Sequence, residues 1–96
     1  MRYAVRSRCL RKIAGFYHNV AKKYKHTYSE QLMNRNIIEA YDAMSLVEKS
    51  LPRRKPTIAR WQGYHMVHAG HWYYAYSIQD DTIIIEDACH EQNMHD

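Results

Sequence analysis

The sequence predicts a single α+β domain in which a layer of two helices packs on one face of a β-sheet. Residues 7–51 carry apolar side chains at helical spacing, residues 59–90 alternate as strands do, and a short alternating segment precedes both. A chain of 96 residues has room for one domain with one modest core. The expected order is an N-terminal strand, a helical hairpin and a three-stranded antiparallel meander, in two layers.

The N-terminal segment is expected to form a strand and then the first helix. Residues 2–6 alternate in polarity, and Ser7 can cap the helix that follows. The apolar face of this helix would consist of Leu10, Ile13, Tyr17, Val20, Ala21 and Tyr24. Residues 1–25 are also basic and amphipathic, as transit peptides are, but their removal would cost the domain a strand and a helix.

The second helix is expected to begin near residue 28. Thr27 and Glu30 stand at the spacing of a capping box, in which each side chain accepts a hydrogen bond from an unpaired backbone amide. Its apolar stripe would consist of Met33, Ile37, Ala40, Met44, Val47 and Leu51. Pro52 would end the helix, and the two helices would form a hairpin.

The rest of the chain predicts three strands, at about residues 59–68, 71–79 and 82–90, with a tight turn at residues 80–81. The first of the two hairpins has two candidate registers. A loop of residues 69–70 would pair His68 with His71, whereas a loop of residues 69–71 would pair His68 with Trp72. The second register separates apolar from polar side chains better, and we prefer it.

The preferred register gathers side chains from three strands on the sheet face that the helices leave open. These are His65, Tyr73, Glu86 and His90, with His68 and His71 at the rim of the hairpin. The opposite face would bury a row of rings, namely Tyr64, Trp72, Tyr74 and Tyr76.

Charge is divided unevenly along the chain. Residues 1–60 hold all 14 Lys and Arg and four acids, for a net charge of +10, while residues 61–96 hold six acids and a net charge of −6. A strongly basic segment indicates a polyanionic partner, most simply nucleic acid. No apolar run reaches the ~18–20 residues of a membrane span. Two isolated cysteines, Cys9 and Cys89, fit a reducing cytoplasm better than a disulfide framework.

The histidines of residues 60–76 have three possible uses. His65, His68 and His71 could bind a metal ion with Glu86 or Asp87, although no cysteine pair accompanies them. They could equally be packed, hydrogen-bonded core residues. They could also cleave RNA, because imidazole titrates near neutral pH and RNA carries its own nucleophile, the 2′-hydroxyl group.

RNA cleavage requires an acid, a base, a cation and a ring that stacks on a base, and it needs no metal or other cofactor. The candidates for acid and base are His65, His68 and His90. The candidates for the cation beside the phosphate are Arg53, Arg54 and Lys55. Tyr73 or Trp72 can stack on a splayed base, as aromatic residues of single-stranded RNA readers do.

These motifs resemble the RelE/ParE superfamily of bacterial toxins, which are small basic domains paired with an antitoxin protein. The resemblance spans the chain and is most specific at residues 61–64 (WQGY), at residues 70–76 (GHWYYAY) and at His90. In the closest branch, the YafQ-type ribonucleases, a histidine, a tryptophan and a late histidine correspond to His68, Trp72 and His90. The chain departs from that branch at His71, where an Asp is expected, and at Lys55, where a His precedes the proline.

The resemblance implies a cytoplasmic, metal-independent endoribonuclease that cuts mRNA on the ribosome and is neutralised by a protein antitoxin. His90 would be the general acid, His68 or His65 the base, and Lys55 would steady the phosphate. RNA would be held by Arg53, Arg54, Arg60, Lys22, Lys23, His71, Trp72 and Tyr73. A ParE-like toxin that inhibits gyrase would have the same fold without catalysis, and a histidine metal-binding module is the third hypothesis.

Overall fold

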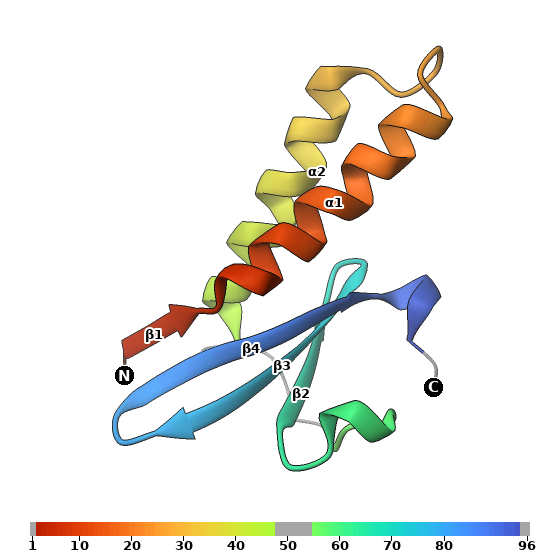
Figure 1. The fold of residues 1–96 in the computed structure, drawn as a ribbon. Helices are drawn as coiled ribbons and strands as arrows, with labels where there is room; N and C mark the ends of the chain where they lie inside the picture. Colours follow the sequence, from red (N-terminus) through yellow and green to blue (C-terminus); the bar gives the residue numbers. More distant parts are fainter. Residues whose placement is uncertain (1, 48–54, 95–96) are drawn as a thin grey trace.

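The computed structural model describes residues 2–47 and 55–94, which form two helices and a four-stranded mixed sheet. The elements are β1 (Arg2–Val5), α1 (Ser7–Lys23), α2 (Glu30–Ala43), β2 (His65–Ala69), β3 (Trp72–Gln79) and β4 (Thr82–His90). Three short 3₁₀ helices complete them: η1 (Met44–Leu46), η2 (Ala59–Trp61) and η3 (Glu91–Asn93). The helices form a hairpin, and α1 packs on β4 (Figure 1). The predicted α+β class, helical hairpin and three-stranded meander are confirmed.

The sheet has the strand order β1-β4-β3-β2. Strand β1 runs parallel to β4 and pairs only with residues 82–85 of it, whereas β2, β3 and β4 form the antiparallel meander. Within the described ranges, the half of β4 from Glu86 to His90 therefore has no strand on its β1 side. The chain of α1 passes beside this half of the strand.

Both helices begin at residues other than those predicted. Arg6 is the N-cap of α1 and makes no side-chain capping bond, while Ser7 is already helical. The N-cap of α2 is Ser29, whose hydroxyl accepts a hydrogen bond from the amide of Leu32 at 3.0 Å. Thr27 is not the cap because its hydroxyl bonds the carbonyl of Tyr24 in the turn that closes α1.

The second helix is also shorter than predicted. It ends at Ala43 and continues as a 3₁₀ turn rather than running to residue 51. Met33, Ala40, Met44 and Val47 of the predicted stripe are buried, so the helical period is correct up to residue 47. Leu51 and Pro52 lie outside the described residues.

The main core lies between the helical layer and the sheet. Its largest rings belong to Tyr17, Trp72, Tyr74 and Tyr76. Their polar atoms are satisfied where they are buried: Trp72 Nε1 donates to Tyr17 Oη at 2.9 Å, and Tyr74 Oη donates to the Ala40 carbonyl at 2.7 Å. Complete burial of such a side chain stabilises the fold by about 1.5–3 kcal/mol, so these rings act first as structure.

The β2–β3 register differs from the predicted one by one residue. Gly70, with a φ of 61°, and His71 form a two-residue loop, so His68 pairs with Tyr73. A shift of one residue exchanges the two faces of a strand. Val67 accordingly packs in the main core, while Met66 lies on the opposite face.

The sheet face opposite the helices is partly covered, whereas the sequence predicted it to be open. Residues 59–61 form a 3₁₀ turn instead of a strand, and Ile58 and Trp61 are each 1% exposed. They bury Met66, Ala75 and Cys89 in a second small core, with Tyr64, Tyr73 and Met94 at its margin. This second core gives Met66 an apolar environment on that face, which explains why alternation alone selected the wrong register.

A β-bulge divides β4 into two parts. The pairs Ile78–Ile83 and Tyr76–Ile85 form as predicted, on either side of the turn in which Asp80 has a φ of 55°. The register then shifts between Ala75 and Tyr76, and Glu86 becomes the extra residue.

Beyond the bulge, every predicted pair is displaced. Ala75 pairs with Asp87 rather than Glu86, and Tyr73 pairs with Cys89 rather than Ala88. His90 pairs with Trp72, so it lies on the helical side of the sheet and not on the opposite face as predicted. This displacement decides the geometry of the candidate site.

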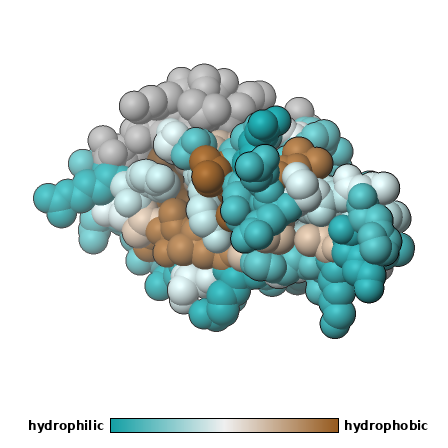
Figure 2. All heavy atoms as spheres, turned by 90° about the horizontal axis from the view of Figure 1, so that it is seen from above, coloured by the Kyte–Doolittle hydropathy of each residue, from teal (hydrophilic) through white to brown (hydrophobic). Residues whose placement is uncertain are grey.

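The face seen from above is largely polar. Hydrophilic residues cover much of it, and apolar residues form a band and separate smaller areas between them (Figure 2). The large apolar side chains that are exposed within the described ranges are Tyr3, Tyr24, Leu32, Ile38 and Ile78. No helix in these ranges is long and apolar enough to cross a membrane.

Candidate active site

Three imidazoles and one carboxylate meet where the β2–β3 loop lies beside the end of β4. Glu91 contacts two of the imidazoles: its Oε2 lies 3.2 Å from His68 Nε2, and its Oε1 lies 3.0 Å from His71 Nδ1. The His71 ring lies nearly parallel to that of His90, with 6.1 Å between ring centroids. The loop is tied to η3 by the amide of Glu91, which donates to the His71 carbonyl at 2.9 Å.

Glu91 determines which nitrogens of its two partners are available. A carboxylate accepts hydrogen bonds, so His71 donates through Nδ1 and His68 through Nε2. This leaves His71 Nε2 and His68 Nδ1 for proton transfer to a substrate. The hydrogen bond from His71, together with the bond from His68, lowers the pKa of Glu91, which therefore stays charged. The His71 side chain is 74% exposed and that of His68 is 29% exposed, so His71 is the more accessible base.

His90 is held in a different state. Its ring is sandwiched in the protein, stacked on Phe16 at 4.1 Å with the edge of Trp72 at 5.3 Å, and the residue is 8% exposed. Burial lowers the pKa of His90, and nearby His71 lowers it further, against the opposing charge of Glu91. Its Nδ1 accepts a hydrogen bond from the amide of Gln92 at 3.2 Å, so the neutral ring carries its hydrogen on Nε2.

These contacts bear on the catalytic role expected for His90. A general acid must carry a second proton, and both burial and the Gln92 amide oppose that proton. A neutral ring with hydrogen on Nε2 is instead a fixed hydrogen-bond donor. The geometry therefore favours His90 as a donor to an anionic group over the role of general acid.

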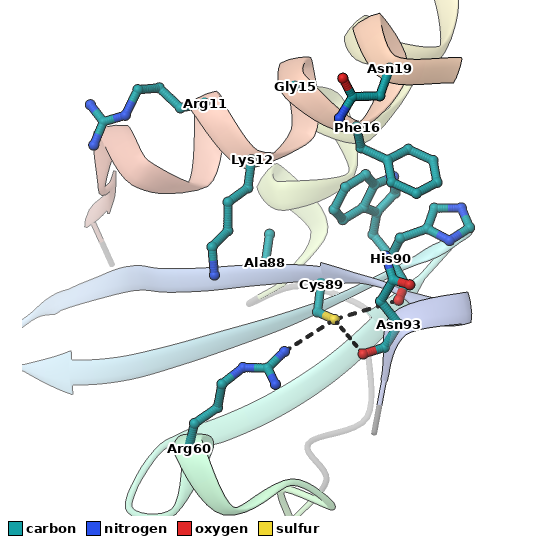
Figure 3. A pocket seen from close by; sticks show the side chains of 11 residues that line it. Arg11, Lys12, Gly15, Phe16, Asn19, Arg60, Ala88, Cys89, His90 and Asn93 are labelled. Atoms are coloured by element: carbon teal, nitrogen blue, oxygen red, sulfur yellow. Dashed lines mark hydrogen bonds between the residues drawn. The ribbon is translucent and has the colours of Figure 1, made fainter. Parts of the chain in front are cut away.

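A cleft of about 400 Å³ opens beside His90, along the half of β4 that has no described strand on its β1 side (Figure 3). One wall is α1 and the other is the end of β4 with η3, while Arg60 enters from η2. Among the described residues, the lining is Arg11, Lys12, Gly15, Phe16, Asn19, Arg60, Trp72, Ala88, Cys89, His90 and Asn93. Three of these side chains are cations and none is an acid, so the cleft suits an anion.

Asp87 positions one of those cations. Lys12 Nζ lies 2.6 Å from Asp87 Oδ1, and Trp61 Nε1 donates to Oδ2 at 2.9 Å. Burial alone would raise the pKa of Asp87, but the bonds from Lys12 and Trp61, and that from the Ala88 amide, outweigh burial and lower it. The buried carboxylate is thus charged, and it fixes Lys12 at the cleft from one side of the sheet and Trp61 from the other.

The residues predicted for catalysis are only partly brought together. His68, His71 and His90 meet, but His65 pairs with Tyr76 on the helical side, with 5.2 Å between ring centroids. The prediction that His65 shares the opposite face with Tyr73 is wrong because of the register shift. Lys55 is exposed and does not line the cleft.

The residues predicted to bind RNA are also dispersed. Arg60 lines the cleft and donates to Cys89 Sγ at 3.3 Å. Lys22 and Lys23 are exposed in the last turn of α1, beyond Asn19, the last α1 residue of the lining. Arg53 and Arg54 lie outside the described residues.

The two candidate stacking rings have different positions. Trp72 is 3% exposed and belongs to the main core, so it has no free face for a base. Tyr73 lies on the opposite face and is half-buried, with the His68 ring stacked on it at 4.3 Å and 13°.

Sequence reasoning missed Arg11, Lys12 and Glu91. The signal for the first two was present, because Arg8, Arg11, Lys12 and Gly15 follow the i, i+3, i+4, i+7 spacing of one helix face. A basic stripe with a glycine in it marks a face that an anion can approach. For Glu91 the sequence offers only its position directly after His90.

The spacing of His65, His68 and His71 does not produce a metal site. Across residues 2–47 and 55–94, no three His, Cys, Asp or Glu side chains are placed to hold a metal ion. Cys9 and Cys89 are both buried, free thiols. Comparisons of the chain with family models, curated proteins and solved structures give no match, so the function is argued from the site itself.

Proposed function

We propose that the chain is an mRNA endoribonuclease of the RelE/ParE toxin kind, closest to the YafQ-like branch, which cuts mRNA on the ribosome and is neutralised by an antitoxin protein. One observation carries the catalytic part of this proposal: two imidazoles share the carboxylate of Glu91, and the ring of one of them, His71, lies beside His90, which lines a cationic cleft. Such a pair can be base and acid in one reaction. The toxin and antitoxin part rests on the resemblance of the sequence motifs.

The proposed reaction uses the 2′-hydroxyl of the substrate as nucleophile. His71 Nε2 takes the proton of this hydroxyl while its oxygen attacks phosphorus, and the bond from phosphorus to the 5′-oxygen breaks. The imidazolium of His68 gives its proton to the departing 5′-oxygen. The products are a 2′,3′-cyclic phosphate and a 5′-hydroxyl end. His90 Nε2, with Lys12 and Arg60, donates hydrogen bonds to the phosphate oxygens as negative charge develops on them.

The test is cleavage of a single-stranded RNA oligonucleotide, free and within a translating ribosome. We expect fragments that end in a 2′,3′-cyclic phosphate, and no cleavage where the 2′-hydroxyl is methylated. His71→Ala should lower the rate by about 10²–10⁴-fold, because a positioned base contributes about that much. His26→Ala is the matched control, since His26 is exposed in the turn between α1 and α2, at the far end of the hairpin from the sheet (Figure 1).

Intact RNA under both conditions would overturn the proposal. If the protein then inhibited supercoiling by gyrase, the ParE-like hypothesis would replace it. Equal rates for His71→Ala and His26→Ala would show that cleavage, if present, does not use this imidazole pair.

A further inference from the structure

A second hollow lies next to the cleft, at the beginning of α1. It has a volume of about 420 Å³ and is lined by Arg6, Ser7, Arg8, Arg11 and Glu86. Arg11 lines both the hollow and the cleft, so the two are neighbours on the surface of α1. The Arg11 side chain extends away from His90 toward the start of α1 (Figure 3).

The β-bulge holds two of these arginines in place. Glu86, the extra residue of the bulge, binds Arg6 Nε through Oε1 at 3.0 Å, and its backbone carbonyl accepts a hydrogen bond from Arg8 Nε at 2.6 Å. Ser77 Oγ donates to the other carboxylate oxygen at 2.7 Å and fixes the carboxylate from the neighbouring strand. Each guanidinium is held through Nε, which leaves its terminal nitrogens for a ligand.

The charge of the hollow favours an anion. Among the described residues of its lining, three guanidinium groups face a single carboxylate, and the first turn of α1 contains no acidic residue. The unpaired amides at the start of this 17-residue helix add positive potential in the same place. Arginine forks match the oxygen pairs of a phosphate group, whereas one glutamate can neutralise only one of the three arginines.

We infer that this arginine hollow is a second phosphate subsite, which binds the backbone of a single-stranded RNA whose reacting phosphate lies in the cleft beside His90. The inference rests on the proposed function, because that function supplies the polynucleotide. From Glu86 to His90 the strand spans ~13 Å at ~3.3 Å per residue. A few nucleotides of single-stranded RNA cover this distance, so the subsite would hold the phosphate of a nearby nucleotide and not the reacting one.

The experiment measures binding of 2′-O-methylated oligouridines, which the enzyme cannot cut, as a function of length and salt. The wild-type chain should bind an octanucleotide more tightly than a dinucleotide. Arg8→Gln and Arg6→Gln should each remove most of that difference. They should also lower the slope of log K against log salt for the octanucleotide by about 0.7, the value for one phosphate contact in a single strand.

Two further variants complete the design. Arg35→Gln removes one positive charge from the exposed surface of α2 and should leave the salt slope unchanged, which controls for net charge. Arg11→Gln covers the case in which loss of Arg6 or Arg8 disturbs the fold, because Arg11 is exposed and its bond to Ser7 is long, at 3.4 Å. It should reproduce the reduced slope with an unchanged melting temperature.

The subsite is overturned if the Arg6, Arg8 and Arg11 variants bind the octanucleotide as Arg35→Gln does. It is also overturned if they lose affinity for dinucleotide and octanucleotide equally, because the groove would then not extend along α1. Cleavage of unmodified RNA by the wild-type chain is measured separately. Length-dependent binding without cleavage would refute the proposed catalysis and leave the subsite standing. Cleavage without length-dependent binding would refute the subsite and leave the proposed catalysis standing.

Discussion

At the scale of single residues, the site depends on which nitrogen of each imidazole is occupied. His68 and His71 face the same carboxylate, whereas His90 faces a backbone amide. A carboxylate stabilises an imidazolium and an amide donor opposes it. The three histidines are therefore given different roles by their neighbours. None of these neighbours could be assigned from residue spacing, because each contact depends on the fold of the β4 end.

The state of His90 predicts how stability depends on pH. Folding lowers the pKa of this residue, so protonation favours the unfolded chain. The stability that its neutral form contributes is complete above the ordinary histidine pKa, and it is lost as the pH falls through the lower pKa of the folded state. His90→Asn should therefore lose less stability than the wild-type chain between about pH 8 and about pH 5.

Chemical denaturation at several pH values measures this difference. Asn keeps an acceptor for the Gln92 amide but does not titrate, which makes it the suitable replacement. His26→Asn, in the exposed turn between the helices, should follow the wild-type pH dependence. If His90→Asn followed it too, the lowered pKa of His90 would be refuted.

At the scale of elements, regular periods were predictable and their interruptions were not. The helical stripes and the strand alternation identified α1, α2, β3 and β4 from side chains that repeat. The cap of α2 was misplaced by two residues because Thr27 and Ser29 are both good caps, and the hydrogen bond from Thr27 to Tyr24 decided between them. The short turn η2 has no period, yet it carries Trp61, which packs against Met66, Ala75 and Cys89 on the sheet face opposite the helices.

Gly15 is a feature of α1 that can be tested directly. It lies inside the helix, where glycine costs about 1 kcal/mol relative to alanine. A Cβ atom built at this position meets no atom within 4 Å. Gly15→Ala should therefore raise the free energy of unfolding by about 0.5–1 kcal/mol.

The same variant probes the cleft, because Gly15 is part of its lining. Denaturant unfolding gives the stability, and oligonucleotide binding gives the effect on the cleft. Stability that stayed the same or decreased would show that the helix does not have the described conformation at this position. A gain in stability with weaker RNA binding would show that the open space above Gly15 is used by the ligand.

At the scale of the whole molecule, Asp87 joins three parts that are distant in sequence. It contacts Lys12 of α1 and Trp61 of η2 from its place in β4. Asp87→Ala would leave the Trp61 Nε1 donor buried without its partner, which costs about 1–3 kcal/mol. The lost bond to Lys12 adds less, because that side chain is half exposed to solvent.

Urea unfolding of Asp87→Ala measures this cost, with Asp42→Ala in the exposed surface of α2 as the control. We expect a lower midpoint for the first variant and a change within about 0.5 kcal/mol for the second. The fluorescence of Trp61 should also change only in the first. Equal urea midpoints for the two variants would mean that α1, β4 and η2 hold together without the Asp87 carboxylate.

The fold class was predictable at this scale because burial of two helices on a sheet is encoded in many residues at once. The site was not predictable, because its geometry depends on two features that each involve a single residue. These are the length of the β2–β3 loop and the bulge at Glu86. Neither feature leaves a clear mark in composition or alternation. The sequence singled out His68, His71 and His90, which the structure brings together, but it placed His65 and His90 on the wrong faces.

The bulge also determines which side chain faces the helices at the end of β4. Beyond it, Ala88 and His90 lie on the helical face, while Asp87 and Cys89 face η2. A strand of the same length that paired without the bulge would bring Cys89 opposite Trp72, on the side of Phe16, in place of His90. The chemistry at the end of the strand therefore depends on one extra residue, while the pairs in the first half of the hairpin, up to Tyr76–Ile85, would be the same with or without it.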